Sequence, residues 1–287
     1  MTLSLNNLTF IIVTFKSEHI IHECIESLPK DSNIIIIENS NNQELKKQLE
    51  EKYSKINVMV QKNSGMGSAN NKGIKLCRTK YAFIINPDVK FYEDTLQELI
   101  SLSSKYKDYS ILAPISDDIK YPNYKINTKH LISDDPDLLS VDSVDGFAML
   151  INKNKFSDNI YFDENFFLFL ENDDLCLRKK KENKKMYVAK KAKINHLGGK
   201  STSITHEKEI ELSRNWHWMW SKFYFKKKHY GYLKAFLTSF PILTTSSIKF
   251  FYYFITNNKF KEKIYIMRLL GLLNSMLGKK SWYRPQV

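Results

Sequence analysis

Cysteine is scarce in this chain of 287 residues. Cys24, Cys77 and Cys176 stand far apart and form no CxxC pair, which argues against a disulfide scaffold or a zinc site and fits a reducing compartment. The first residues also lack the basic segment and long apolar run of a signal peptide, because residues 1–5 lead directly into a strand-like run. We therefore expect a cytoplasmic protein.

Two glycine-rich phosphate motifs are missing as well. No GxGxxG follows the first predicted strand, where residues 14–17 read Thr-Phe-Lys-Ser. Residues 198–201, Gly-Gly-Lys-Ser, match the end of a Walker A loop but lack its upstream glycine. The sequence therefore argues against a dinucleotide-binding fingerprint and against a P-loop.

Acidic residues are rare in the C-terminal part of the chain. Residues 176–287 carry 25 Lys/Arg and 5 Asp/Glu, a net charge of +20, whereas residues 1–175 carry 19 and 26, a net charge of −7. The overall charge of +13 therefore belongs to the C-terminal part. Such asymmetry indicates a polyanionic partner, either nucleic acid or an anionic membrane surface.

Strand-like and helix-like segments alternate through the first 85 residues. Residues 8–14, 33–38, 56–60 and 81–85 are predicted strands, and their spacing is typical of βαβ units and a parallel sheet. The natural topology puts the first strand in the centre, beside the strand that ends at residue 85. Thr14, Glu38 and Asp88 would then lie at the edge where open α/β sheets bind ligands.

Asn86-Pro87-Asp88 ends the fourth predicted strand. Proline has no N–H to give to a sheet, so the strand stops there and Asp88 follows directly. A carboxylate at this edge suits a divalent cation that also holds phosphates. Asn-Pro-Asp is also ordinary turn chemistry, and the residues alone leave both interpretations open.

A second polar cluster follows an aromatic run at residues 161–169. Glu171, Asn172, Asp173 and Asp174 precede a basic amphipathic helix, predicted from Leu175 to about residue 183. Acids in the first turn of a helix complement its dipole, which is a purely structural role. Carboxylates beside apolar surface also have raised pKa values, which suits a general base. Further along, we predict two short strands at 186–189 and 192–196.

Residues 211–287 differ in composition from the rest and are predicted to form a helical, basic and aromatic region. Residues 236–255 are largely apolar but contain Pro241 and Lys249, so they are a marginal candidate for a spanning helix. Aromatic residues flanked by lysines fit a helix that lies in the interface of an anionic membrane. Packing onto the first domain or a homodimer contact is the alternative.

In combination, these segments resemble the family 2 glycosyltransferases, especially the bacterial rhamnosyltransferase-like branch of cell-surface polysaccharide synthesis. The resemblance covers residues 8–205 and depends on several motifs in order. These are Phe10–Phe15, Glu38-Asn39-Ser40, Asn63-Ser64-Gly65 with Asn70 and Gly73, Asn86-Pro87-Asp88, Asp145-Gly146, Phe166–Arg178 and His196-Leu197-Gly198-Gly199.

The resemblance implies the GT-A fold, a Rossmann-like and mostly parallel sheet flanked by helices, with the helical region as a C-terminal extension. It implies a catalytic domain at 1–210 and a second region at 211–287. It also assigns Asp145 and Gly146 to the donor sugar and acceptor. The residues expected to bind the nucleotide are Thr14, Phe15, Glu38, Asn39, Ser40, Asn63, Gly65, Asn70 and Asn86.

For the chemistry, the resemblance implies a Mg²⁺ or Mn²⁺ ion held by Asp88 and His196. One departure concerns the general base, because Asn172 stands where the family usually has an aspartate, and an amide cannot accept the proton. Glu171 is our first choice for the base and Asp173 the second.

The expected activity is inverting transfer of rhamnose or another hexose. The donor would be a UDP- or dTDP-sugar, the acceptor a lipid-linked or polysaccharide glycan, and the location the inner face of the cell membrane. Nucleic acid is not an expected partner. The competing functions are a nucleotidyltransferase of sugar-nucleotide synthesis, a non-catalytic protein that binds through its basic tail, and an inactive scaffold.

Overall fold

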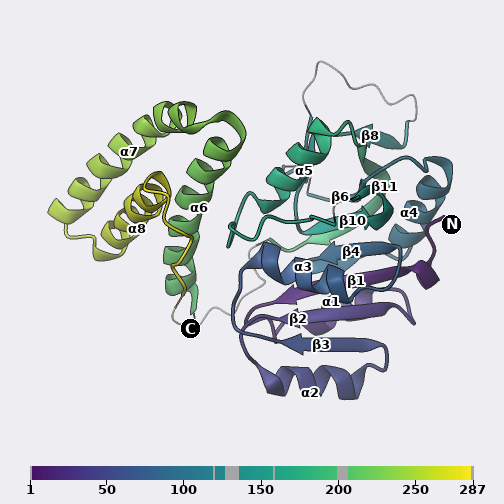
Figure 1. The fold of residues 1–287 in the computed structure, drawn as a ribbon. Coiled ribbons are helices and arrows are strands. Elements are labelled where there is room, and N and C mark those ends of the chain that lie inside the picture. Colours follow the sequence, from purple (N-terminus) through teal and green to yellow (C-terminus); the bar gives the residue numbers. More distant parts are fainter. Residues whose placement is uncertain (1, 119, 127–135, 158, 199–205, 286–287) are drawn as a thin grey trace. The chain divides into compact units, whose positions relative to one another are not determined.

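The computed structural model describes residues 2–118, 120–126, 136–157, 159–198 and 206–285. The chain forms two compact units. We call Met1–Asp163 with Asn172–Ser203 the sheet unit, and Glu164–Glu171 with Ile204–Val287 the helical unit. Figure 1 shows the elements of each unit along the chain.

The sheet unit is built on one mixed sheet. Its strands follow the order β3-β2-β1-β4-β10-β6-β11-β5, with β8 paired to β11. The pairs β3-β2, β2-β1 and β1-β4 are parallel, so the prediction of a central first strand beside the fourth is confirmed. The strands are β1 (Leu8–Thr14), β2 (Asn33–Glu38), β3 (Ile56–Val60), β4 (Tyr81–Ile85), β5 (Val89–Phe91), β6 (Ile111–Ser116), β8 (Leu138–Ser140), β10 (Ala148–Asn152) and β11 (Met186–His196). A short pair, β7 (Tyr124–Lys125) and β9 (Ser143–Val144), lies outside it.

Helices cover both faces of this sheet, as in Figure 1. Phe10 and Ile12 of β1 pack with apolar residues of α1, α2 and α4, whereas Ile11 and Val13 pack with those of α3 and α5. This alternation is what a strand buried on both faces requires. The helices are α1 (Ile21–Ser27), α2 (Gln43–Lys52), α3 (Met66–Leu76), α4 (Thr95–Lys105) and α5 (Glu171–Lys181), with short 3₁₀ turns η1 (Leu5–Asn7) and η2 (Lys153–Lys155). The prediction of an α/β fold flanked by helices is confirmed.

Two boundaries differ from the sequence prediction. α5 begins at Glu171, four residues before the predicted start at Leu175, because the polar residues form its first turn. Residues 186–196 form the single strand β11 instead of two strands. Its pairing with β6 shifts register between Ala189 and Lys193, so the predicted break between two strands is a local irregularity within one strand.

The helical unit contains α6 (Glu207–Tyr230), α7 (Tyr232–Ile255) and α8 (Lys259–Met276). Gly231 separates α6 from α7 with a φ of +87°, a conformation that side chains disfavour. Gly271 lets α8 approach α6, because a Cβ atom there would lie 2.1 Å from the carbonyl oxygen of Trp216. Within the described residues, no helix has both the length and the apolar character needed to cross a membrane.

Candidate functional site

The carboxyl ends of β1 and β2 lie side by side at the predicted edge. Thr14 and Glu38 are register partners in this parallel pair, and both side chains are fully buried. The Glu38 carboxylate accepts hydrogen bonds from the backbone N–H groups of Ser40 at 3.0 Å and Asn42 at 2.6 Å, and from the Ser40 hydroxyl. Glu38 therefore shapes the turn after β2 by holding its backbone.

A network of amides joins the turns after β2 and β3 to the start of α3. The Asn39 side chain donates to Asn63 Oδ1 at 3.1 Å and accepts from Gln61 Nε2 at 2.8 Å and the Ser64 N–H at 3.1 Å. Asn63 Oδ1 also accepts from the Gly65 N–H at 3.1 Å. The structure thus brings the predicted residues of these two loops together.

Glycine positions explain how α3 reaches this edge. Gly65 precedes α3 with a φ of +88°, which favours glycine. Gly73 lies against β1, because a Cβ atom there would be 2.4 Å from Ile11 Cγ2.

Asn70 is buried on α3, and its Oδ1, like Thr14 Oγ1, is a buried atom without a hydrogen-bond partner in the described structure. Buried polar atoms of this kind call for an additional partner such as a ligand or water.

Asp88 and His196 are brought together by strand pairing. β5 follows Asp88 and pairs antiparallel with β11, with His196 opposite Val89. As a result His196 Nε2 lies 3.5 Å from Asp88 Oδ1, and the Leu197 N–H donates to the Asp88 carbonyl oxygen at 3.1 Å. The Phe147 ring stacks on the imidazole with centroids 3.8 Å apart. The Phe147 carbonyl oxygen accepts from the Asn86 N–H at 2.9 Å.

The Asp88–His196 pair fits part of a divalent-metal site. Asp88 is 2% exposed, and its Oδ1 makes no hydrogen bond in the described structure, which leaves a hard oxygen ligand beside an imidazole nitrogen. Within the described ranges, no cluster of three or more His, Cys, Asp and Glu side chains is arranged to hold a metal. Mg²⁺ is commonly held by one or two carboxylates together with water and substrate phosphates, so two protein ligands are compatible with such an ion.

The first turn of α5 faces the turn that contains Asp145 and Gly146. Asn172 Nδ2 donates to the Val144 carbonyl oxygen at 3.0 Å, and a Cβ atom at Gly146 would lie 3.4 Å from the Asn172 Cβ. An aspartate at position 172 has no hydrogen to give to that carbonyl. The amide that replaces the expected acid therefore has a structural function in this chain.

The acids of α5 have different partners. Both oxygens of Asp173 accept from Lys125 Nζ, at 2.7 and 3.0 Å. Asp174 is fully buried and accepts from Arg178 Nε at 3.0 Å. Glu171 is 7% exposed and is the last residue of the segment that belongs to the helical unit. The two candidates for the base, Glu171 and Asp173, thus belong to different units.

The carboxyl group of Asp145 has a pKa above the usual value of an aspartate. Burial is the main cause, and the neighbouring Asp173 carboxylate adds to it, while the charges of Lys125 and His196 act in the opposite direction. Burial penalises the charged form of a carboxyl group. Asp145 therefore binds its proton more tightly than an exposed aspartate does.

Sequence reasoning missed three residues of this site. Gln61 links the loops and accepts from Lys72 Nζ, Phe147 covers His196, and Lys125 neutralises Asp173. Gln61 could have been found as the first residue beyond β3, at the same edge as Glu38. Phe147 and Lys125 gave no sequence signal, because their partners lie 49 and 48 positions along the chain.

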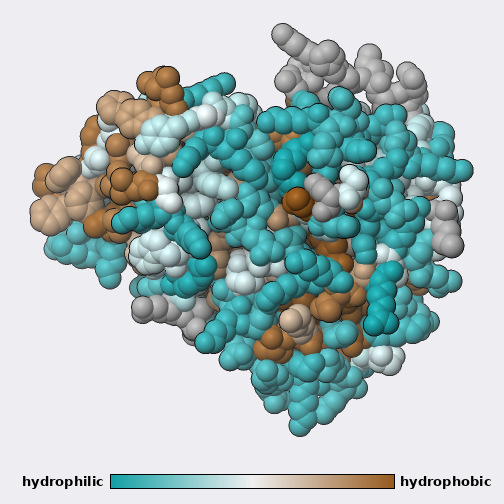
Figure 2. Space-filling view, viewed as in Figure 1, coloured by the Kyte–Doolittle hydropathy of each residue, from teal (hydrophilic) through white to brown (hydrophobic). Residues whose placement is uncertain are grey.

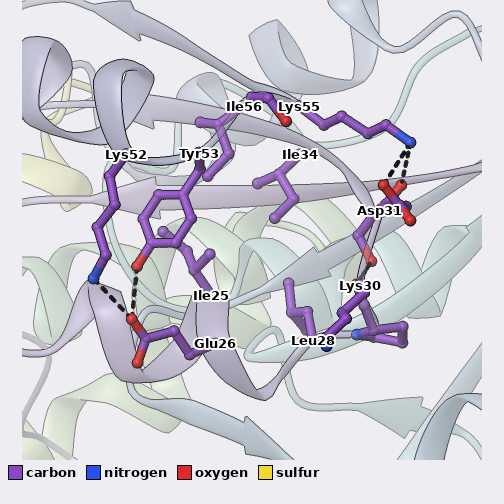
Figure 3. A pocket seen from close by; sticks show the side chains of 13 residues that line it. Ile25, Glu26, Leu28, Lys30, Asp31, Ile34, Lys52, Tyr53, Lys55 and Ile56 are labelled. Carbon is purple, nitrogen blue, oxygen red and sulfur yellow. Dashed lines mark hydrogen bonds and ion pairs between the residues drawn. The ribbon is translucent and has the colours of Figure 1, made fainter.

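An open cavity of about 370 Å³ lies at the opposite, amino ends of the strands. Figure 3 shows that four of its charged side chains form two pairs, Lys52 with Glu26 and Lys55 with Asp31. Lys52 Nζ lies 2.8 Å from Glu26 Oε1, and Lys55 Nζ lies 3.0 Å from Asp31 Oδ1. Both of its carboxylates are already paired with lysines, so the carboxyl-end cluster, which has buried polar atoms without partners in the described structure, is the better candidate for the functional site.

A family model matches this chain. The model for "Glycosyl transferase family 2" matches residues 9–164, more than half of the chain. A curated relative, the low-salt glycan biosynthesis hexosyltransferase Agl10 of Haloferax volcanii, is 25% identical over 197 residues. The match covers 62% of this chain and 63% of that relative, so the chain spans less than two thirds of the relative's length.

Solved structures share the fold. The mannosyltransferase PcManGT from Pyrobaculum calidifontis, in complex with GDP-Man and Mn²⁺, has a TM-score of 0.57 at 8% identity, covering 96% of this chain and 88% of that one. GalNAc-T7 with UDP, GalNAc and Mn²⁺ has a TM-score of 0.54 at 13% identity, covering 74% and 51%. At such identities the likeness concerns the fold alone, and it confirms the expected GT-A architecture.

Proposed function

The chain belongs to glycosyl transferase family 2, and we propose that it transfers a hexose from a nucleoside diphosphate sugar to an acceptor hydroxyl with inversion at the anomeric carbon. The observation that carries this proposal is the Asp88–His196 pair, 3.5 Å apart at the carboxyl edge of the sheet. The hexosyltransferase relative in glycan biosynthesis supports it. Rhamnose or another hexose as the sugar, and a cell-surface glycan as the product, are the finer parts of the proposal.

Asp88 and His196 would hold a Mg²⁺ or Mn²⁺ ion, as the Mn²⁺ in the neighbours' structures suggests. When bound, such an ion supplies Lewis-acid stabilisation for the negative charge that develops on the leaving diphosphate. In this chain, Phe147 fixes the plane of the imidazole by stacking. The Val89 N–H donates to the Asn86 carbonyl oxygen at 3.2 Å, which closes the turn that carries Asp88.

The nucleotide would lie over the amide network at the ends of β1, β2 and β3. Thr14 Oγ1 and Asn70 Oδ1 are buried polar atoms without partners in the described structure, and they would contact its polar groups. Glu38 would act mainly by holding the turn that carries Asn39 and Ser40. UDP or dTDP is the proposed carrier, with Phe15, Asn63, Gly65 and Asn86 completing the contacts.

Glu171 would act as the general base that takes the proton of the acceptor hydroxyl. Asp173 is the second choice, because both of its carboxylate oxygens already accept hydrogen bonds from Lys125 Nζ. Asp145 and Gly146 would contact the donor sugar or the acceptor. Asn172 cannot act as a base and would hold the turn that carries them.

The experiment is thermal stabilisation of the purified full chain by UDP, dTDP, GDP, CDP and ATP, with and without MnCl₂. A ligand that binds only the native state raises the melting temperature. We expect manganese-dependent stabilisation by UDP or dTDP, and none of this dependence in Asp88→Ala. Equal stabilisation of wild type with and without manganese would overturn the metal assignment, and the absence of any stabilisation would overturn nucleotide binding at this site.

We further propose that α7 binds an anionic membrane surface, which would place the enzyme at the inner face of the cell membrane near a lipid-linked acceptor. α7 buries only a narrow stripe of mostly small residues, including Ala235, Ser239 and Ser246. Its large apolar residues are exposed instead, as the brown surface of the helix in Figure 2 shows. Those exposed by 51–80% are Leu233, Leu237, Phe240, Ile248, Phe251, Tyr252, Phe254 and Ile255.

Charge supports a membrane as the occupant of this face. From Lys222 to Arg284 the chain has 13 Lys/Arg and a single acid, Glu262, a net charge of +12. Lysines are interleaved with the aromatic rings, as with Lys259 over Phe254 at 5.6 Å. Exposed apolar side chains with flanking cations are the features that bind helices to the interface of anionic bilayers.

A further inference from the structure

The segment after α8 returns along α6 and is fixed there by buried hydrogen bonds. Trp220 Nε1 donates to the Lys279 carbonyl oxygen at 2.9 Å. His217 is fully buried and contacts Ser281 Oγ through Nδ1 and the Tyr283 carbonyl oxygen through Nε2, both at 2.9 Å. We call residues 279–284 the return segment.

The protonation of His217 follows from these partners. Burial lowers its pKa to about 3, so the ring is neutral at ordinary pH. A carbonyl oxygen can only accept a hydrogen bond, hence Nε2 carries the hydrogen and donates to Tyr283. Nδ1 then accepts from the Ser281 hydroxyl. His217 thus fixes the return segment at two points.

The return segment reaches the aromatic run that precedes Glu171. The Phe167 ring contacts two side chains. Its centroid is 4.4 Å from that of the stacked His217 ring and 3.7 Å from the guanidinium carbon of Arg284. Arg284 Nη1 donates to the carbonyl oxygens of Ser281 at 2.9 Å and Tyr283 at 2.7 Å. Phe167 is only 5% exposed as a result.

The neighbours of Phe167 in the chain, residues 166, 168 and 169, are held by α6. Phe166 packs on Tyr224 with centroids 4.9 Å apart, and Phe169 packs on Trp218 at 5.4 Å. The Ser221 hydroxyl donates to the Leu168 carbonyl oxygen at 2.8 Å. These contacts lie on both sides of Phe167.

The backbone that these contacts hold is strained. Phe169 and Leu170 have φ values of +70° and +66°, and Glu171 follows directly as the first residue of α5. Positive φ is unfavourable for bulky residues and persists only where the surroundings enforce it. The turn that leads into Glu171 therefore depends on the packing around it.

We propose that the return segment is a clamp on this turn, and that Arg284 and His217 are positioning residues for Glu171. Arg284 and His217 both contact the Phe167 ring, and together with α6 they hold the strained backbone of Phe169 and Leu170. The role assigned to Glu171 rests on the proposed function. Nucleotide and metal binding use residues of the sheet unit and do not require the clamp.

The test compares the full-length variants Arg284→Ala, Arg284→Lys and Lys280→Ala. Lys280→Ala is the matched control, because it removes one exposed positive charge from the same segment. Amide hydrogen exchange is measured in peptides that cover residues 164–171. We expect exchange there to become at least tenfold faster in Arg284→Ala, to be partly restored in Arg284→Lys, and to match wild type in Lys280→Ala.

Turnover and ligand binding provide the second measurement. In Arg284→Ala we expect kcat to fall about tenfold with the donor that wild type accepts, while the donor KM and the stabilisation by UDP with MnCl₂ stay at wild-type values. Unchanged exchange at 164–171 in Arg284→Ala would overturn the clamp. Faster exchange with unchanged kcat would overturn the positioning role. If wild type shows no transfer, the proposed function fails, and the exchange experiment still decides whether the clamp exists.

Discussion

The two units of this protein distribute their apolar and charged residues in opposite ways. In the sheet unit, β1 and β4 are buried along their whole length, and helices cover both faces of the sheet. In the helical unit, α7 leaves residues such as Leu233 and Ile255 exposed by 72% and 80%. Monomeric soluble proteins rarely expose contiguous apolar surface of this kind. The functional candidates of the sheet unit lie at the carboxyl ends of its parallel strands, whereas the helical unit has an exposed apolar surface on α7.

This difference assigns the binding of a small ligand to the sheet edge and the proposed binding of a membrane surface to α7. The polar atoms at the sheet edge, Thr14 Oγ1, Asn70 Oδ1 and Asp88 Oδ1, are few and buried, as expected for a site that binds one small ligand specifically. The cations of the helical unit are many and exposed, which suits a surface without a defined shape. Variants of the exposed face of α7 should therefore leave nucleotide binding intact, and variants of the sheet edge should leave binding to membranes intact.

Asp88→Ala should give the largest effect, because it removes the buried carboxylate of the proposed metal pair, Asp88 and His196. We expect transfer to be abolished and manganese-dependent stabilisation by UDP or dTDP to disappear, while binding to vesicles stays unchanged. Glu93→Ala is the control, since it removes an exposed acid five residues away. Wild-type transfer by Asp88→Ala would mean that the edge is not the metal site.

Glu171→Gln should lower turnover by about 10²–10⁴-fold, the usual contribution of a general base. Donor affinity and nucleotide stabilisation should remain normal, because the amide keeps the shape of the side chain. Asp173→Asn serves for comparison and should have a smaller effect, since Asp173 is already paired with Lys125. A reversed order of the two kcat values would transfer the role of the base to Asp173.

Phe251→Ser combined with Ile255→Ser should weaken binding to phosphatidylglycerol vesicles more than tenfold. Burial of one large apolar side chain contributes about 1.5–3 kcal/mol, and these two are 60% and 80% exposed. Tyr121→Ser is the control, because Tyr121 is an exposed aromatic residue of the sheet unit. Flotation with vesicles measures the effect. Unchanged flotation together with loss of a dimer in sedimentation would identify α7 as a contact between copies.

The sequence was sufficient for the parallel half of the fold because its signals are local. The runs 8–14, 33–38, 56–60 and 81–85 coincide with β1 to β4, and Pro87 marks the end of β4. The approach of His196 to Asp88 depends on the pairing of β5 with β11, which joins residues more than 100 positions apart. Composition and periodicity carry no signal for such a pairing, so the assignment of Asp88 and His196 to one metal site came only from the family resemblance and stays a proposal.

For the acidic cluster at the start of α5, the sequence identified the residues but not their partners. Asn172 was recognised as a departure from the family pattern, but its hydrogen bond to Val144 could not be foreseen. Likewise, the aromatic residues before Glu171 indicated an apolar environment, but the sequence did not show which residues they contact. Their partners are Trp218, Tyr224 and Arg284 of the helical unit, and such long-range packing is decided by the tertiary fold.

Asp145→Asn should give the smallest effect, a gain in stability of the sheet unit at the expense of its function. The pKa of Asp145 is raised in the folded state, mainly by burial, so the folded protein binds this proton more tightly than the unfolded chain does. At pH values below the pKa of Asp145 in the unfolded chain, the group is protonated in both states and does not change the free energy of unfolding. As pH rises through the folded pKa, the buried carboxylate ionises and stability is lost.

Asparagine removes that cost, because it stays neutral at every pH. In metal-free protein we expect the melting temperature of Asp145→Asn to exceed that of wild type by about 2 °C at pH 7 and to equal it at pH 3. Asp118→Asn, an exposed acid of the same unit, should show no such difference. A lower melting temperature at pH 7 would mean that Lys125 and His196 stabilise the Asp145 carboxylate by more than burial destabilises it. The sugar contact proposed for Asp145 predicts a raised donor KM in the same variant. Asp145 would then lower the stability of the sheet unit while it contributes to substrate binding. The exposed apolar residues of α7 would act in the same way in the helical unit, because they cost stability in water and bind the membrane.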